Sequence, residues 1–427
     1  MSSTSSTSEL FAWEEQTVGD LFDLEGGFAF KSSEFLEDGV PVIKIKNVKS
    51  GFFSKHDFSF VSEHFLTARP QKVARQSDLL ISMSGNRHDG SPETWVGKVA
   101  YFDAPEKYLI NQRVGALRVK DARKADPRFF SYLLSSLTYQ ELFIAIATSS
   151  GGQANLSPGQ ILSAPVYFPK LAEQQRIAYI LGTLDDKIEL NRRMAATLEE
   201  MARALFKSWF VDFNPVRAKA EGRPTGLPPD IDALFPDAFE DSELGKIPKG
   251  WEVGGVAKLA DITSGKRPTA KFPDPLPEAI VPLWGGNGPM AYVADPLFTE
   301  PILLTGRVGT LGSVFRICEP CWPSDNTLVI RPSDLSAFEY LFLHLSLIDF
   351  ASLNRGSTQP LLTQSDLKAQ KLAIPTSAVM DCFSRITGSM YRRIDQAALE
   401  TRTIAALRDA LLPKLISGEL SVSEVGR

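Results

Sequence analysis

Side chains that could read DNA bases occur in two sets of glycine-containing segments. Arg, Lys, Asn and Gln form paired hydrogen bonds with base edges, and a nearby glycine lets the backbone approach closely. In the first half of the chain these residues are Lys44, Lys46, Asn47, Asn86, Arg87 and Gln153. In the second half they are Asn287, Arg307, Arg355 and Gln359, and Trp284 beside Gly285 is a further candidate for DNA binding. For each of them, a solvated loop or a phosphate contact is the alternative to base reading.

The segments that could carry catalysis are incomplete. Asn214-Pro215-Val216 stops short of the Asn/Asp-Pro-Pro-aromatic element of an adenine methyltransferase, and Ala260 stands where a phosphate-binding loop before Lys266 needs its first glycine. The glycines of 285–288 and 306–312 favour turns over a cofactor loop. The four histidines are scattered, so we expect no catalytic residue and no metal site in this chain.

Two cysteines, Cys318 and Cys321, have the spacing of half a zinc site or of a redox pair. A structural zinc ion needs two further ligands, and none lies nearby in the sequence. We therefore expect these cysteines to have no ligand-binding role.

Length and composition bound the class of protein. A chain of 427 residues exceeds what one core usually supports, which predicts two or more domains. No apolar run approaches the roughly 18 residues that cross a bilayer, so we expect a cytoplasmic protein with no membrane partner. The net charge of −5 argues weakly against nucleic acid binding, but four lysines between Pro41 and Lys55 occur without an acidic residue among them.

The chain repeats itself at an offset of 206 residues. This shift aligns Gln153 with Gln359 and Pro169 with Pro375, and it continues into an apolar, helix-like segment, where Leu205 aligns with Leu411. A constant offset over about fifty positions predicts two related halves. Short β-like runs and Gly/Pro turns precede the helix in each half and predict mixed, β-rich domains.

Each half ends in a long helix with an apolar stripe. The stripe has the spacing of four and three residues that is typical of a coiled coil. The expected seam consists of Ile177, Leu181, Leu184, Ile188, Asn191, Leu198 and Leu205 in the first helix, and Phe383, Met390, Ile394, Ile404, Leu407 and Leu411 in the second. One such stripe alone would favour packing on its own domain, whereas two at matching positions predict that the helices pair. Pro413 should end or kink the second helix.

The expected organisation is α+β, a pseudo-two-fold repeat of two mixed, β-rich domains joined by two long helices packed as an antiparallel coiled coil. The expected segments are a disordered tail (1–10), a first domain (11–170), a first helix (171–213), a Pro- and Gly-rich connector (214–250), a second domain (251–375), and a second helix with a C-terminal tail (376–427).

Two segments carry a family resemblance. LAEQQRIAYILGTLDDKIELNRRMAATLEEMARALFKSWFVDFNPVRAKAEGRPTG, from Leu171 to Gly226, resembles the central region of the specificity subunits of type I restriction-modification systems, and LRDALLPKLISGEL, from Leu407 to Leu420, resembles their C-terminal region. The resemblance implies two target-recognition domains, each reading half of a bipartite, asymmetric site in double-stranded DNA. It also implies methyltransferase subunits that carry SAM, a separate restriction subunit that uses ATP and magnesium, and no cofactor in this chain.

Two other functions stay open from the sequence. One is a single-chain DNA methyltransferase or nuclease whose catalytic motifs are not recognised. The other is a coiled-coil scaffold that does not bind DNA. Methyl transfer or cleavage by the purified chain alone would favour the first, and failure to bind DNA in the presence of a methyltransferase subunit would favour the second.

Overall fold

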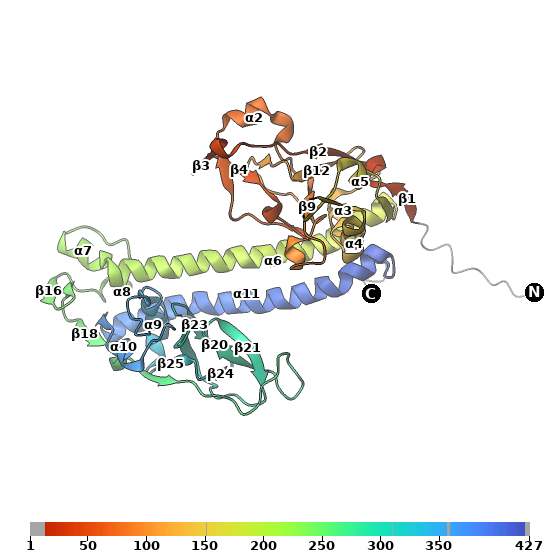
Figure 1. The fold of residues 1–427 in the computed structure, drawn as a ribbon. Helices are drawn as coiled ribbons and strands as arrows, with labels where there is room; N and C mark the ends of the chain where they lie inside the picture. Colours follow the sequence, from red (N-terminus) through yellow and green to blue (C-terminus); the bar gives the residue numbers. More distant parts are fainter. Residues whose placement is uncertain (1–12, 151, 310, 357–358, 423–427) are drawn as a thin grey trace, which may run out of the picture. The chain divides into compact units, whose positions relative to one another are not determined.

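The structure is a computed structural model that describes residues 13–150, 152–309, 311–356 and 359–422. It consists of two compact units, one within Met1–Leu190 together with Glu400–Arg427, and one within Asn191–Leu399. Figure 1 shows the ribbon with the labels of its helices and strands. The expected disordered tail, residues 1–10, lies outside the described residues.

The first unit is built on two four-stranded sheets. The first has the order β10 (Val99–Tyr101), β8 (Leu79–Ser82), β12 (Val114–Val119) and β2 (Phe22–Gly26), with all neighbours antiparallel. The second has the order β11 (Leu109–Ile110), β4 (Val40–Ile43), β7 (Ser59–Val61) and β3 (Phe35–Leu36), and its β11 and β4 are parallel. β8 and most of β12 are apolar and buried. Such continuous apolar runs are typical of strands covered on both faces.

Helices complete the core of the first unit. They are α1 (Val18–Leu21), α2 (His64–Ala68), α3 (Pro127–Leu134), α4 (Leu137–Ile146) and α5 (Pro158–Leu162). The Asp126 side chain caps α3 by accepting a hydrogen bond of 2.9 Å from the amide of Phe129, and Pro127 supplies the preferred first helical residue. Phe129 and Phe130 of α3 are buried in the same cluster as Phe22 of β2.

Three small sheets lie beside these layers. β13 (Thr148–Ser150) and β14 (Gln153–Asn155) form a hairpin that pairs with β9 (Ser84–Gly85), while β1 (Glu14–Thr17) pairs with β15 (Pro165–Phe168) and β5 (Val48–Lys49) pairs with β6 (Phe52–Phe53). Within the described residues, no single helix is both long and apolar enough to cross a bilayer. The bent pair α3 and α4 passes that test by length and composition, and it contributes to the buried core.

The main sheet of the second unit repeats the strand order of the first unit. Its main sheet runs β19 (Ala260–Ser264), β25 (Thr327–Pro332), β22 (Ile302–Gly306) and β23 (Val314–Ile317). A three-stranded sheet runs β21 (Gly288–Val293), β20 (Val281–Gly285) and β24 (Trp322–Pro323), with β20 and β24 parallel. β18 (Glu252–Gly255) pairs with β26 (Lys371–Ile374), and the helices are α9 (Phe338–Leu345) and α10 (Gln364–Lys368).

The register of the strands confirms the internal repeat. Glu14 pairs with Phe168 in the first unit, and Glu252 pairs with Ile374, which lies 206 residues after Phe168, in the second. The amide of Val18 donates to the carbonyl of Ala164 at 2.9 Å, and the corresponding amide of Val256 donates to Gln370 at 2.9 Å. The two halves therefore share one topology, as expected of an α+β repeat.

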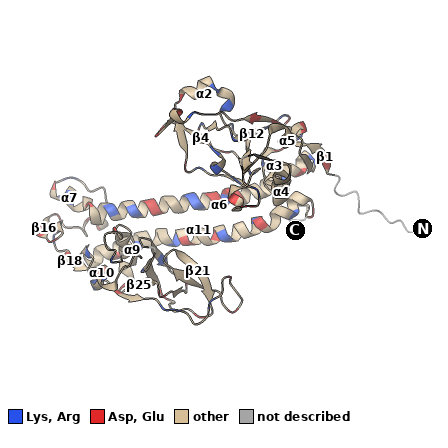
Figure 2. Cartoon of the chain, viewed as in Figure 1, with Lys and Arg blue, Asp and Glu red and all other residues tan. Residues whose placement is uncertain are grey.

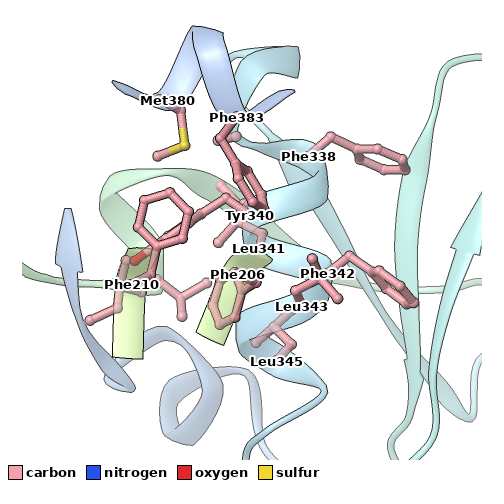
Figure 3. Close-up of a cluster of buried hydrophobic side chains, with 14 of the residues drawn as sticks. Phe206, Phe210, Phe338, Tyr340, Leu341, Phe342, Leu343, Leu345, Met380 and Phe383 are labelled. Carbon is pink, nitrogen blue, oxygen red and sulfur yellow. The ribbon is translucent and has the colours of Figure 1, made fainter. Parts of the chain in front are cut away.

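Two long helices, α6 (Leu171–Phe206) and α11 (Ser377–Ser417), each contribute residues to both units. In the first unit Ile177 and Leu181 of α6 are buried in one cluster with Leu415 and Ile416 of α11. In the second unit, rings near the end of α6 pack on a ring near the start of α11. The centroid distances from Phe383 are 6.1 Å to Phe206 and 4.8 Å to Phe210 (Figure 3). In both units, early residues of one helix meet late residues of the other, so the segments pair antiparallel.

Most residues of the expected seam are buried or half-buried. Ile177, Leu181, Ile188 and Asn191 are buried, as is Phe383, while Leu184, Leu198, Leu205, Met390, Ile394, Ile404 and Leu411 are half-buried. Leu407 differs, because 49% of it is exposed and the neighbouring Arg408 contacts α6 in its place. The inner side of α11 also includes Thr387 and Tyr391, which the apolar stripe does not single out.

Three further expectations differ in detail. α6 ends at Phe206 and continues as a π-helical turn (Lys207–Val211), after which Phe213 adopts a left-handed backbone with φ of 51°. Pro413 was expected to end or kink the second helix, and it does not end it, because α11 continues to Ser417. The connector contains α7 (Asn214–Ala220), α8 (Pro229–Asp232) and the hairpin of β16 (Phe239–Ser242) and β17 (Gly245–Pro248), and it contributes Val216 and Phe235 to the core of the second unit.

Candidate nucleic-acid interface

The β13–β14 hairpin places Gln153 in the first unit next to an arginine from a distant segment. Arg113 directly precedes β12, and its Nη1 atom donates a hydrogen bond of 2.9 Å to Oε1 of Gln153. Both side chains are exposed. An exposed guanidinium beside an exposed amide offers both donors and acceptors, which suits contacts with base edges or phosphates. We call Arg113 and Gln153 the first corner.

Asn86 and Arg87 shape a loop beside the first corner. The Asn86 amide nitrogen donates to Oγ1 of Thr94 at 3.1 Å, and Nη2 of Arg87 donates to the carbonyl of Ala147 at 2.5 Å. Gly85 has to be glycine, because an added Cβ would lie 2.6 Å from the carbonyl of Thr94. Both predicted residues thus make contacts within the domain, which hold the loop in one conformation.

The tip of this loop is tied to α4. Nε2 of His88 lies 2.8 Å from Oε2 of Glu141, and about half of each side chain is exposed. At the base of the loop, the buried Lys98 donates to the carbonyl of Glu93 at 2.5 Å. Burial, followed by repulsion from Lys49, lowers the pKa of Lys98 to about 8. The loop is therefore anchored at both its tip and its base.

The lysine-rich segment is less available than its sequence indicates. Lys44 donates to Oγ of Ser59 at 2.7 Å and lies 4.1 Å above the ring of Phe35, and burial lowers its pKa. Lys46 forms an exposed ion pair of 3.0 Å with Asp57. Asn47 is 1% exposed and donates to the carbonyl of His56 at 2.8 Å. Asn47 therefore holds a turn and does not present its amide to solvent.

In the second unit Gln359 aligns with Gln153 at the offset of 206 residues, and its segment pairs with that of Arg307, because the amide of Gly309 donates to the carbonyl of Pro360 at 3.0 Å. Arg307 follows β22, and its Nη1 atom donates to Oγ of Ser264 at 3.3 Å, while Gln359 is exposed. Gly356 permits the tight approach of this segment, because an added Cβ would lie 1.7 Å from the carbonyl of Gln359. We call Arg307 and Gln359 the second corner.

The other predicted residues of the second unit divide into two kinds. Trp284 is half-buried and its ring centroid lies 5.4 Å from that of Phe315, so it belongs mainly to the core. Arg355 donates to Oδ1 of Asp366 at 2.8 Å, and this hydrogen bond raises the pKa of Arg355. Asn287 is exposed in the turn between β20 and β21.

Backbone hydrogen bonds show which positions of the two corners are equivalent. The amide of Met83 donates to Arg113 at 2.9 Å, and the amide of Leu156 donates to Met83 at 2.9 Å. In the second unit the amide of Arg307 donates to Asn326 at 2.8 Å, and the amide of Leu362 donates to Arg307 at 2.9 Å. Met83 thus corresponds to Arg307, and Arg113 to Asn326. Each domain supplies one arginine to its corner, but from a different strand.

Arg113 is not among the residues that the sequence pattern singles out. The repeat slips in register upstream of the hairpin, and its offset of 206 residues places Arg113 on Glu319, so the repeat does not single out Arg113. What marks Arg113 is its position directly before β12, a largely buried strand that pairs with β8. That position is evident only once the strands are paired.

Charge elsewhere in the described chain is mixed in sign. Figure 2 shows Lys and Arg interspersed with Asp and Glu along α6 and α11.

Cys321 is fully buried, and burial raises the pKa of its thiol to about 12, which opposes thiolate chemistry. Among the residues that the structure describes, no group of three or more His, Cys, Asp or Glu side chains could hold a metal ion.

A family model described as the type I restriction modification DNA specificity domain matches residues 12–200 and 248–379. The chain belongs to this family. The specificity family supplies DNA recognition and is distinct from the catalytic subunits. The two matched segments contain both corners, so the family match covers the whole candidate interface.

Full-length relatives support the same assignment. The specificity subunit of the type I restriction enzyme HindI of Haemophilus influenzae is 26% identical, with 96% of this chain and 99% of the relative covered. The MjaIX specificity subunit of Methanocaldococcus jannaschii is 24% identical, with 97% and 94% covered. The crystal structure of a type I S subunit from M. genitalium shares the fold, with a TM-score of 0.66 and 16% identity over 96% of this specificity chain and 97% of that chain.

Proposed function

We propose that this chain is the DNA-reading subunit of a type I restriction-modification complex and that its two recognition domains read the two halves of a bipartite, asymmetric site. The observation that carries the proposal is the pair of corners. Beside the equivalent glutamines Gln153 and Gln359, the two domains carry different side chains at equivalent positions, with Met83 and Arg113 in one and Arg307 and Asn326 in the other. Different readers recognise different sequences, so the site is asymmetric.

The proposal includes the partners that a non-catalytic reader requires. Methyltransferase subunits bind the helical region and bring SAM and adenine chemistry, and a restriction subunit brings ATP and magnesium. Double-stranded DNA is the ligand, and the complex works in the cytoplasm. In this proposal the recognition domains are residues 11–170 and 251–375, the helical parts are 171–213 and 376–427, and 214–250 connects the halves.

The test uses the full chain expressed together with a methyltransferase subunit of a type I system. Sequencing of modified bases should show one bipartite, asymmetric motif that disappears when this chain is omitted. The same motif without this chain would contradict the proposal. Methylation or cleavage by the purified chain alone would instead support a single-chain enzyme.

A further inference from the structure

Asp185 joins three elements of the first unit. Its Oδ1 atom accepts a hydrogen bond of 2.8 Å from Nη1 of Arg408 on α11, and its Oδ2 atom accepts one of 2.5 Å from the hydroxyl of Tyr132 on α3. The side chains of Arg408 and Asp185 are 30% and 28% exposed. Although burial opposes the charge of Arg408, its hydrogen bonds to Asp185 and Asp409 raise its pKa. The contact between α6 and α11 is therefore charged and largely shielded from water.

A second ion pair joins the same two helices. Nζ of Lys187 lies 3.5 Å from Oε2 of Glu400, with side-chain exposures of 43% and 31%. Both pairs lie in the part of the helical interface that belongs to the first unit. Here α6 and α11 recognise each other by charge as well as by apolar packing.

The repeat places uncharged residues opposite each other at the equivalent positions of the second unit. The offset of 206 residues relates Asp185 to Tyr391 and Arg408 to Ala202. Tyr391 is 4% exposed and Ala202 is 0% exposed, and both belong to one apolar cluster. The Tyr391 ring packs against the ring of Phe342, with centroids 5.6 Å apart. The Asp185–Arg408 ion pair of the first unit thus has two uncharged residues, Tyr391 and Ala202, as its equivalents in the second unit.

This difference determines what each helix would meet in a second copy of itself. If α6 paired with another α6 in the same antiparallel register, each Asp185 would face Ala202 of the copy. If α11 paired with another α11, each Arg408 would face Tyr391 of the copy. Lys187 would likewise face Met194, which the offset relates to Glu400. Both alternatives remove the partner that a partly buried charge has on the other helix, which is unfavourable.

We propose that the Asp185–Arg408 pair makes α6 and α11 of one chain select each other over a second copy of the same half-chain. Charged residues at a helix interface commonly set partner choice in this way, because the wrong pairing loses an attraction and leaves a desolvated charge. The consequence for assembly is one copy of each recognition domain on a helical pair. The proposal concerns assembly only and does not depend on DNA binding.

The test keeps both halves present by nicking the full chain. A protease site is inserted after Gly222, which lies in an exposed turn after α7 with nothing within 4 Å of an added Cβ. After cleavage, native mass spectrometry measures the ratio of mixed pairs to like pairs of the two fragments. The parent chain should remain mixed. Arg408→Ala should lower the ratio about tenfold, which corresponds to about 1.4 kcal/mol.

A charge swap and a matched control make the result specific. Asp185→Arg combined with Arg408→Asp should restore most of the parental ratio, because the attraction is re-formed with its direction reversed. The control is Asp409→Ala. Asp409 also binds Arg408, at 2.7 Å, but it lies on the same helix as Arg408, so its removal should leave the ratio of mixed to like pairs unchanged.

An unchanged ratio in a folded Arg408→Ala chain would overturn the proposal. A swapped chain that forms like pairs as readily as Arg408→Ala would also overturn it. If circular dichroism shows that Arg408→Ala does not fold, the swapped chain decides. A folded swapped chain with mixed pairs supports the proposal, and an unfolded one overturns it.

Discussion

Arg113 and Gln153 lie 40 residues apart in the sequence and are joined by a hydrogen bond of 2.9 Å at the surface of the first recognition domain. In the second domain the corner consists of Gln359, which aligns with Gln153, and of Arg307, which corresponds to Met83. Each corner combines a guanidinium, which can bind guanine through two hydrogen bonds, with an amide that can bind adenine. Base reading by either corner can therefore be tested separately.

Replacing Arg113 with alanine should relax the first half-site. Loss of a paired contact with a base costs about 1–3 kcal/mol of discrimination, whereas the second half-site should stay as it is. The measurement is the methylated motif of cells that carry the complex. Arg123→Ala is the control, because the Arg123 side chain is 90% exposed and pairs with Asp121, two residues away in the loop after β12. Equal weakening at all sequences would show that Arg113 binds phosphate and would contradict base reading.

Replacing Arg307 with alanine should relax the second half-site and leave the first unchanged. Arg307 is the cation of the second corner. Its guanidinium has five N–H donors, and those that do not bind Ser264 can bind a base. The same motif sequencing measures the effect, with Arg331→Ala as control because Arg331 pairs with Asp261 away from the corner. A changed first half-site would show that the two domains do not read independently.

Replacing Phe383 with alanine should lower the free energy of unfolding by about 3–5 kcal/mol, as expected for a fully buried ring. Phe383 is 0% exposed and packs among Phe206, Phe210 and Tyr340 in the cluster of Figure 3. Denaturant titration of the purified chain measures the loss. Leu347→Ala, at a position that is 63% exposed in the same unit, should change stability by less than about 0.5 kcal/mol. Equal losses in the two variants would contradict the assigned core.

Acidification should destabilise the second unit through His344. Burial lowers the pKa of His344 to about 4 from its ordinary value of 6.5, so the unfolded chain binds a proton between these values and the folded chain does not. Stability is complete above pH 6.5 and falls as the pH falls toward 4. Between pH 7 and pH 5 the parent should lose about 2 kcal/mol more than His344→Gln. Identical pH profiles would show that His344 is not desolvated.

The paired helices and the repeat could be predicted because their signals are local and periodic. The apolar spacing of four and three residues marks the inner side of a helix wherever that helix packs, and a constant offset keeps two helices in matching register. Leu407 shows the limit of this rule, since the inner position of that turn is taken by Arg408, a polar residue that a search for apolar stripes passes over.

The sequence by itself determined the class of fold, the repeat and the family, because these depend on composition, on periodicity and on long segments that resemble each other or a known family. Only the tertiary structure decided which polar side chains face solvent. Asn47 is buried by a turn that closes on His56, and Arg113 reaches Gln153 across paired strands. Hydrogen bonds between residues far apart in the chain set these positions. They depend on strand pairing and loop closure, which no local pattern encodes.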